Sequence, residues 1–428
     1  MSNLRHALLI NYHWPPCGGP GVHRWLRFSR YFRENGWNLT VYAPENAAWT
    51  TVDENLVAQV PVEVTVIRQP IFEPQRYLSK NLNPVGQAGL ARKKKSLLQD
   101  LIIWVRGNVF IPDSRVFWIR PSVRFLDRYL KAHPEIEVII SSGPPHSLHM
   151  IAERLKSRHP NLRWIADFRD PWTQIDFYQE LLPGAWADKR QKAMEKSVLT
   201  CADAVVTVSE ACAEGLEAIV NRPVKVITNG YDFPEFDSAS IKHDPVFTIS
   251  HFGSMPASRN PEVLWKALGE LVNEDAAFAS DLKIRLVGSV DISVIESIRR
   301  SGLTERHEHI ATVPHSASID LQRQSQVLLL VGNNTGNVKG ILTGKVFEYL
   351  GARRPILTIG QRGSNLEEVI RNTASGRFIG FDETAACKDA VKELYRAYRN
   401  GNLSAQPIGL EKYSSRNLAR EFCNILGK

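Results

Sequence analysis

The 428-residue sequence has few cysteines, and their spacing suits neither a disulfide framework nor a structural zinc ion. Disulfide-rich domains and zinc sites need cysteines that are paired or regularly spaced. The sequence has no CxxC pair, so both classes are excluded and a reducing, cytoplasmic compartment is expected. The five cysteines are Cys17, Cys201, Cys212, Cys387 and Cys423.

Long apolar runs are also missing. No run approaches the roughly 20 residues needed to span a bilayer. The segment from Met1 to Tyr12 lacks the cationic region, long apolar core and small-residue cleavage site of a signal peptide. We interpret it instead as a buried first strand.

Acidic residues are outnumbered, and the net charge of +8 indicates anionic partners such as nucleotides, lipids or nucleic acid. Residues 85–131 hold ten cationic and three acidic side chains, a net of +7, with apolar residues interleaved from Leu97 to Trp104. Such a segment can lie on anionic headgroups at the inner face of the cell membrane. The alternative is a solvated insertion whose apolar face belongs to the core. No nucleic-acid-binding module accompanies it, so no nucleic-acid partner is expected.

Short β-branched runs alternate with helical stretches, which predicts an α/β fold with parallel sheets. A polar segment with two prolines, 232–245, interrupts the pattern and indicates a linker. We therefore predict one Rossmann-like domain over 1–233, with the basic insert, and a second over 246–405. A final helix, at 410–426 within 406–428, is free to pack back on the first domain. The predicted strands are 6–12, 38–43, 63–68, 137–142, 163–168, 204–209 and 224–228, then 246–252, 283–287, 309–313, 327–331, 355–359 and 377–380.

Three segments of the first half leave predicted strands with residues that can meet a ligand. Gly18 and Gly19 precede a helix, and glycines there allow close backbone approach to an anion or a hydroxyl. His146 follows a strand end, where ligands of open α/β sheets bind. Asp167-Phe-Arg-Asp-Pro-Trp172 holds Arg169 and Asp170, which form either a structural ion pair involving Asp167 or Asp170, or a group that positions an acceptor.

The second half carries the most informative segment, Lys339-Gly-Ile-Leu-Thr-Gly-Lys-Val-Phe-Glu348. Gly344 and Lys345 are expected to open a helix whose amides face a phosphate. Glu348 lies one turn further on, and because helical side chains lean toward the N-terminus it can reach a ribose diol. Arg259 is placed to meet the diphosphate, and the donor-binding set is completed by Gly18, Gly19, Gly253, Val313 and Thr343.

Together these segments resemble glycosyltransferase family 4, a retaining family of the GT-B fold. The best-matched parts are the Gly-rich first loop, Asp203-Ala-Val-Val-Thr-Val-Ser209, Val226-Ile-Thr-Asn-Gly230, Phe252-Gly253 and Gly344-Lys-Val-Phe-Glu-Tyr-Leu350. Ser-Gly-Pro-Pro-His146 and Asp-Phe-Arg-Asp-Pro-Trp172 are similar to a subgroup associated with surface polysaccharide synthesis.

The resemblance implies two Rossmann-like domains that face each other across a cleft and move a sugar from a nucleotide-sugar donor to a lipid-linked or glycan acceptor. Glu348 matches the second residue of the family's Glu-x7-Glu motif, whereas Gly340 replaces the first. Ser254 and Asn260 stand where the family commonly has Arg and Lys. The resemblance assigns His146 to the transferred sugar.

No Asp-x-Asp pair, the metal-binding motif of the GT-A class, occurs in the sequence. We therefore predict a metal-independent enzyme without cofactor, in which Arg259 and Lys345 stabilise the leaving diphosphate. Two alternatives stay open because fold does not dictate function. They are a nucleotide-sugar epimerase of the same fold and a non-catalytic nucleotide-sugar-binding protein.

Overall fold

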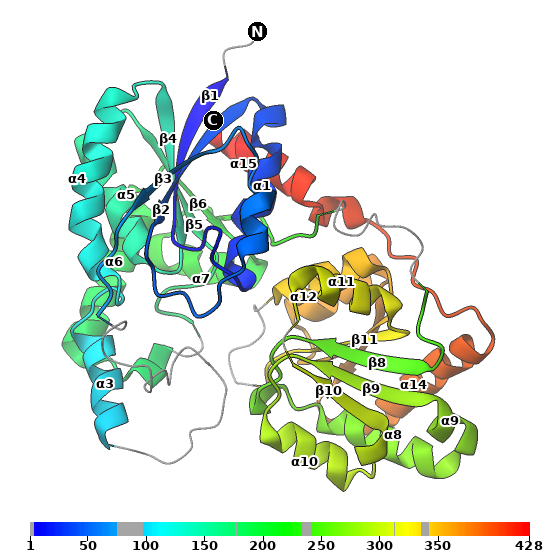
Figure 1. Ribbon diagram of the computed structural model, residues 1–428. Helices are drawn as coiled ribbons and strands as arrows, with labels where there is room; N and C mark the ends of the chain where they lie inside the picture. The colour runs from blue at the N-terminus through cyan, green and yellow to red at the C-terminus, as the bar shows by residue number, and fades with distance from the viewer. Residues whose placement is uncertain (1–3, 75–96, 176–177, 233–241, 312, 335–341) are drawn as a thin grey trace. The chain divides into compact units, whose positions relative to one another are not determined.

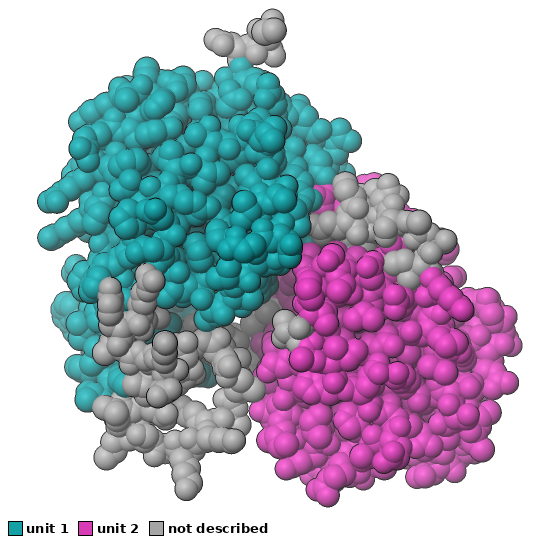
Figure 2. All heavy atoms as spheres, viewed as in Figure 1, with its two compact units in different colours: residues 1–88, 92–229, 415–428 teal, residues 89–91, 230–414 magenta. Residues whose placement is uncertain are grey.

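The computed structural model describes residues 4–74, 97–175, 178–232, 242–311, 313–334 and 342–428. The chain divides into two units (Figure 1, Figure 2), and each is built on one parallel β-sheet. Unit 1 comprises residues 1–88, 92–229 and 415–428, and unit 2 comprises 89–91 and 230–414. The predicted α/β class with two parallel sheets is confirmed.

The sheet of unit 1 has the strand order β3-β2-β1-β4-β5-β6-β7, with every pair parallel. The interior strand β1 carries the unbroken apolar run Ala7 to Ile10, because side chains on both of its faces are fully buried. Strand order reverses direction between β1 and β4, so their carboxyl ends open a crevice of the type that binds ligands. The strands are β1 Arg5–Asn11, β2 Trp37–Pro44, β3 Thr65–Gln69, β4 Ile136–Gly143, β5 Arg163–Phe168, β6 Ala204–Thr207 and β7 Lys225–Val226.

Helices cover both faces of this sheet. One face packs against α1 (Pro20–Phe32) and the C-terminal helix α15 (Ser415–Leu426), where the rings of Trp25 and Phe422 are 5.0 Å apart. The other face packs against α4 (Val116–Ala132), α5 (Ser147–Arg158), α6 (Ala185–Cys201) and α7 (Glu210–Val220).

The last helix begins later than predicted. Residues Leu410–Tyr413 form a separate 3-10 turn, η7, whose Tyr413 packs on Phe347 of unit 2 with ring centroids 5.3 Å apart. Ser414 is extended, and α15 starts at Ser415. The single helix predicted over 410–426 is therefore wrong at its beginning, because the chain leaves unit 2 for unit 1 at that point.

The sheet of unit 2 has the order β10-β9-β8-β11-β12-β13, again parallel. The strands are β8 Phe247–Phe252, β9 Leu282–Val287, β10 His307–Ile310, β11 Val327–Val331, β12 Ile356–Gly360 and β13 Gly376–Gly380. The helices are α8 Glu262–Glu274, α9 Ala276–Asp281, α10 Ile292–Arg300, α11 His315–Gln324, α12 Gly344–Ala352, α13 Asn365–Thr373 and α14 Thr384–Arg399.

Strand β10 lies earlier than the predicted 309–313. It pairs with β9 from His307 to Ile310, although its sequence, His-Glu-His-Ile, is largely polar. An edge strand tolerates such residues because one side of its ladder is open to water. The β-branched residues that follow Ile310 in the sequence caused the predicted strand to be placed too far along the chain.

Several predicted features lie outside the described residues. They include the lysines Lys93, Lys94 and Lys95, the linker residues 233–241 and Gly340. Of the basic segment, the structure describes α3 (Leu97–Asn108) and α4. Among the helices that the structure describes, none is both long and apolar enough to cross a bilayer.

Candidate functional site

The predicted donor residues of unit 2 gather at the carboxyl edge of its sheet, where glycine loops pack closely. Gly253, directly after β8, has φ +95°, and Gly288, directly after β9, has φ +118°. A Cβ on Gly288 would lie 2.7 Å from the carbonyl oxygen of Gly253, so glycine is required for the two loops to touch.

Lys345 lies over Gly253. A Cβ on Gly253 would be 2.5 Å from Cε and 2.8 Å from Nζ of Lys345. The lysine stands in the first turn of α12, whose N-cap Thr343 accepts a hydrogen bond from the Lys345 amide at 3.4 Å. The ammonium group is therefore placed between a glycine loop and a helix N-terminus.

The charge of Lys345 is poorly compensated. Burial lowers the pKa of Lys345 to about 7, and repulsion from Arg259 adds to the shift, while Glu348 partly opposes it. No carboxylate among the described residues forms an ion pair with Lys345. Two neighbouring cations beside a helix N-terminus form a site that an anion would stabilise.

Arg259 is held in this group by the loop after β11. It ends the short 3-10 turn η5 (Ala257–Arg259), and its Nε donates to Oδ1 of Asn333 at 2.5 Å. The amide of Asn334 donates to the carbonyl oxygen of Ser258 at 2.7 Å, which ties the two loops together. The sequence did not reveal Asn333, because no spacing relates it to Arg259.

The two positions that depart from the family pattern have different surroundings. The Asn260 side chain makes hydrogen bonds within unit 2, since its amide donates to Oγ of Ser297 at 2.9 Å and accepts from Nε1 of Trp265 at 2.8 Å. Ser254 is exposed. Arg259 is therefore the cation that this loop brings near Lys345.

The remaining predicted donor residues divide into open and packed positions. Gly344 is exposed, and a Cβ there would meet nothing within 4 Å, so space for a ligand exists above the helix end. Glu348 is half-buried near Lys345, whereas Val313 packs partly buried against the core beneath α12.

In unit 1, the first glycine loop forms the start of α1. The amide of Gly18 donates to the carbonyl oxygen of Thr51 at 2.9 Å, and Gly19 is the N-cap with φ +82°. Pro20 occupies the first helical turn, where its missing N–H costs nothing. This helix end lies after β1, at the carboxyl edge of the sheet.

His146 lies at the same edge and is almost fully buried. It is the N-cap of α5, and its ring stacks on Trp172 with centroids 4.5 Å apart and planes 3° apart. Burial, with repulsion from His149 and Arg169, holds the pKa of His146 well below its ordinary value, so the ring is neutral. Its Nδ1 has no partner among the described residues.

Arg169 serves the backbone. Its side chain donates to the carbonyl oxygens of Gly143 at 3.3 Å and Pro144 at 2.7 Å, and also to that of Gly21. It therefore ties the loop before His146 to the start of α1. Asp170 is exposed beside it, and its carboxylate opposes the lowering of the Arg169 pKa by burial.

Asp167 pairs with Arg24, so of the two alternatives for Arg169 the pair with Asp167 is not the one formed. The carboxylate is fully buried and accepts from Nη2 and Nε of Arg24 at 3.0 and 3.2 Å. It also accepts from Nε1 of Trp25 at 2.9 Å and Oγ of Ser142 at 2.8 Å. The contact joins α1 to β5 across more than a hundred residues, which no local motif could reveal.

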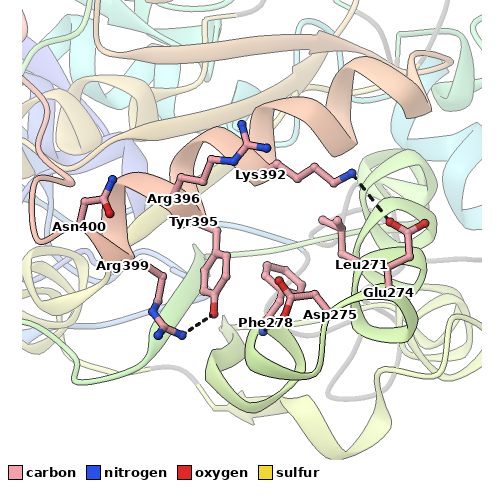
Figure 3. Close-up of a pocket in the computed structure, with 9 residues that line it drawn as sticks. All are labelled: Leu271, Glu274, Asp275, Phe278, Lys392, Tyr395, Arg396, Arg399 and Asn400. Carbon is pink, nitrogen blue, oxygen red and sulfur yellow. Dashed lines mark hydrogen bonds and ion pairs between the residues drawn. The ribbon is translucent and has the colours of Figure 1, made fainter.

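A pocket of about 430 Å³ lies elsewhere in unit 2, between α8, α9 and α14 (Figure 3). Two of its cations are paired with carboxylates. Arg399 lies 3.3 Å from Asp281, and Lys392 lies 3.8 Å from Glu274. The pocket is lined by Leu271, Glu274, Asp275, Phe278, Lys392, Tyr395, Arg396, Arg399 and Asn400, none of which is a predicted site residue.

This pocket and the Lys345 group occupy opposite edges of the sheet. Because α8 and α14 each follow a strand, their C-terminal halves run back toward the amino edge. The chemistry of the carboxyl edge, rather than the pocket, therefore defines the candidate site.

Comparison with known proteins gives a family and a fold. The family model described as a glycosyl transferase 4-like domain matches residues 18–231. No curated protein sequence matches this one. Three similar solved structures are a TarM variant of S. aureus in complex with fondaparinux, α-GlcNAc-glycerol and UDP, the glycosyltransferase WaaG involved in lipopolysaccharide biosynthesis, and a putative UDP-N-acetylglucosamine 2-epimerase from Listeria monocytogenes.

These structures share the architecture of the chain but little of its sequence. The TarM variant is 9% identical with a TM-score of 0.59, covering 99% of this chain and 100% of its own. WaaG is 12% identical with a TM-score of 0.53, covering 98% and 95%. The epimerase is 11% identical with a TM-score of 0.55, covering 98% and 95%. At these identities the likeness establishes the GT-B fold alone.

Proposed function

The chain belongs to the glycosyl transferase 4-like family, and from this membership we propose that it moves a sugar from a nucleoside-diphosphate donor to an acceptor hydroxyl with retention of configuration. The observation that carries the proposal is the pair of cations at the carboxyl edge of unit 2. Lys345 and Arg259 lie together beside the N-terminus of α12, and no carboxylate among the described residues forms an ion pair with Lys345. A diphosphate supplies the charge that this group lacks.

In the proposed reaction the bond between the anomeric carbon and the diphosphate oxygen breaks as the acceptor hydroxyl attacks from the same face. The hydroxyl proton passes to the departing diphosphate, so atoms and charge balance without a separate base. Lys345, Arg259 and the amide of Gly344 stabilise the negative charge that develops on the leaving group. Because Arg259 is cationic, the helix end is polarised and Lys345 is protonated once the diphosphate is bound, the proposed enzyme needs no metal or cofactor.

The other predicted residues receive roles in the same proposal. Glu348 binds the donor ribose, because it lies one turn from the helix end that faces the diphosphate. His146, which the family resemblance assigns to the transferred sugar, is neutral and is proposed to hydrogen-bond a hydroxyl of that sugar. Gly18 and Gly19 are assigned to the donor, and Asp170 with the loop that Arg169 holds forms the acceptor side.

The acceptor proposed is a lipid-linked or glycan molecule of cell-envelope polysaccharide synthesis, used at the inner face of the membrane. The similarity of the His146 and Asp167–Trp172 segments to a polysaccharide subgroup supports it, as does the basic composition of residues 85–131. The proposal places the chain in the cytoplasm or peripherally on the membrane.

A direct test starts with a thermal-shift screen of nucleotides and nucleotide sugars, since ligands of the folded state raise its melting temperature. The best donor is then incubated with glycan and lipid-linked acceptors, with and without excess chelator, and products are identified by mass spectrometry. Transfer that persists in chelator supports the proposal. Interconversion of the donor sugar without transfer would identify an epimerase, and binding without turnover a non-catalytic protein.

Glu348→Gln tests the ribose assignment. Loss of a charge-assisted hydrogen bond should weaken nucleoside-diphosphate binding by about 1.5–3 kcal/mol, measured by calorimetry. Glu296→Gln, at an exposed position of α10, removes the same charge elsewhere in unit 2 and should leave affinity unchanged. Equal affinities for wild type and Glu348→Gln would refute the assignment.

A further inference from the structure

Exposed apolar side chains concentrate on one part of unit 1. Seven of the twelve large hydrophobic residues that are exposed among the described residues lie on three segments that the fold brings together. Large exposed apolar patches on soluble proteins mark surfaces that meet another phase or molecule. The seven are Phe72, Leu101, Trp104, Val109, Phe117, Leu182 and Trp186, which we call the apolar surface of unit 1.

Specific contacts hold the three segments side by side. The ring of Phe117 meets Phe72 and Phe110 at centroid distances of 5.6 and 5.9 Å. Asn108, at the end of α3, donates to the carbonyl oxygen of Leu182 at 2.9 Å and accepts from the amide of Gly184 at 2.7 Å. The apolar surface is thus built from the loop after β3, the segment that runs from α3 into α4, and the turn that leads into α6.

A stripe of cations continues from this surface along α4. Arg120, Arg124 and Arg128 follow Phe117 at helical spacings of three, four and four, and all three are exposed. None of the three forms an ion pair with a described carboxylate. The aspartate of this helix, Asp127, is engaged instead by Lys131 and His159 at 2.9 Å each.

The second flank, at the start of α6, is also basic. Trp186 is 67% exposed, and the guanidinium of Arg190 lies 5.8 Å from its ring centroid. Asp188 is paired with Lys192 at 2.7 Å, which leaves Glu180 as an exposed acid of this segment. Aromatic and aliphatic groups bordered by cations suit an interface that is apolar inside and anionic outside.

We infer that the apolar surface of unit 1 and the arginine stripe of α4 form a docking surface for an anionic lipid bilayer. Trp104, Trp186 and the aliphatic groups enter the headgroup–acyl boundary, and the arginines contact lipid phosphates. A second copy of the chain is disfavoured as occupant, because a twofold contact would bring the arginine stripe against itself. The inference deepens the proposed function and rests on it for its purpose, since a lipid-linked acceptor is presented at such a surface.

The test is co-sedimentation of the full chain with vesicles of phosphatidylcholine, with or without phosphatidylglycerol. Wild type is expected to sediment with the anionic vesicles only, and less so as salt rises. Each cation near the membrane surface raises the partition coefficient by about one order of magnitude or less. The triple variant Arg120→Gln, Arg124→Gln and Arg128→Gln should therefore lower the partition coefficient roughly a hundredfold.

A matched triple variant separates a local surface from net charge. Lys266→Gln, Arg299→Gln and Arg396→Gln also remove three exposed cations, all from unit 2, and should sediment like wild type. Trp104→Ser with Trp186→Ser should weaken binding at every salt concentration, because it removes the apolar contribution. Each variant is checked for the wild-type melting temperature.

Three results would overturn the inference. They are a wild type that stays in the supernatant at low salt, equal losses in the two triple variants, and self-association without lipid that the Trp104→Ser and Trp186→Ser changes abolish. If the inference about lipid is wrong, the protein does not sediment with vesicles but still binds nucleoside diphosphate in the same preparation. If the proposed function is wrong, the protein does not bind nucleoside diphosphate but still sediments with vesicles. The two outcomes are therefore distinguishable.

Discussion

Lys345 should make nucleoside-diphosphate binding depend on pH between about 7 and 9. In the structure without ligand its pKa is lowered to about 7, first by burial and then by repulsion from Arg259. A bound diphosphate brings negative charge to the ammonium group and returns its pKa toward the ordinary value. Binding above pH 7 therefore takes up a proton, and the affinity must fall as pH rises.

The expected magnitude follows from the lowered pKa. At pH 8 roughly a tenth of Lys345 is protonated, so binding takes up about nine-tenths of a proton. The dissociation constant should rise by about tenfold for each pH unit above 7. The terminal phosphate of the nucleotide ionises near pH 6, so its charge changes little over this range.

Isothermal titration calorimetry measures both quantities. Titrations with nucleoside diphosphate at pH 8, in buffers of different ionisation enthalpy, give the proton uptake from the slope of the observed enthalpy. Lys345→Gln should bind weakly with no proton uptake, and Lys345→Arg should bind with no pH dependence, because a guanidinium stays charged. A wild type with constant affinity from pH 7 to 9 and no buffer dependence would refute the reasoning. The same lysine predicts that unit 2 gains stability with rising pH between about 7 and 10, since the unfolded state then holds the extra proton.

Three further predictions concern a glycine of unit 2 and, in unit 1, a histidine of the candidate site and a buried aspartate. Gly253→Ala should lower nucleotide affinity, because its Cβ would lie 2.5 Å from Cε of Lys345. The control Gly302→Ala is strained by a similar positive φ, but its Cβ would meet nothing within 4 Å, so it should keep wild-type affinity in the same calorimetric assay. His146→Ala should reduce turnover by about 10- to 100-fold with nucleotide affinity unchanged. Because the ring is already neutral, the wild type and the variant should show the same dependence of rate on pH near pH 6.5. Normal turnover in the variant would remove His146 from the site. Asp167→Asn should destabilise unit 1 by about 3–5 kcal/mol in urea unfolding, because Arg24 stays buried without its carboxylate, and a loss below about 1 kcal/mol would contradict this account.

Local patterns determined much of the fold from the sequence alone. The unbroken apolar runs of β1 and β11 identified buried parallel strands, because such strands exclude water from both faces. Gly344-Lys-Val-Phe-Glu348 marked the start of α12, because a helix end and its side chains lie within one turn of each other. The family resemblance rested on the same short segments and is confirmed by the match over residues 18–231.

Contacts between distant segments were decided only by the tertiary structure. The ion pair of Asp167 with Arg24, the bond from Arg259 to Asn333 and the stacking of His146 on Trp172 each join parts of the chain that no period or motif relates. The apolar surface of unit 1 is a further case. The sequence pointed to Leu101 and Trp104 within the basic segment, whereas Phe72, Leu182 and Trp186 became recognisable as part of the same surface only when folding left them exposed beside it. A sequence records which side chains are apolar or charged, whereas burial and pairing are properties of the packed chain.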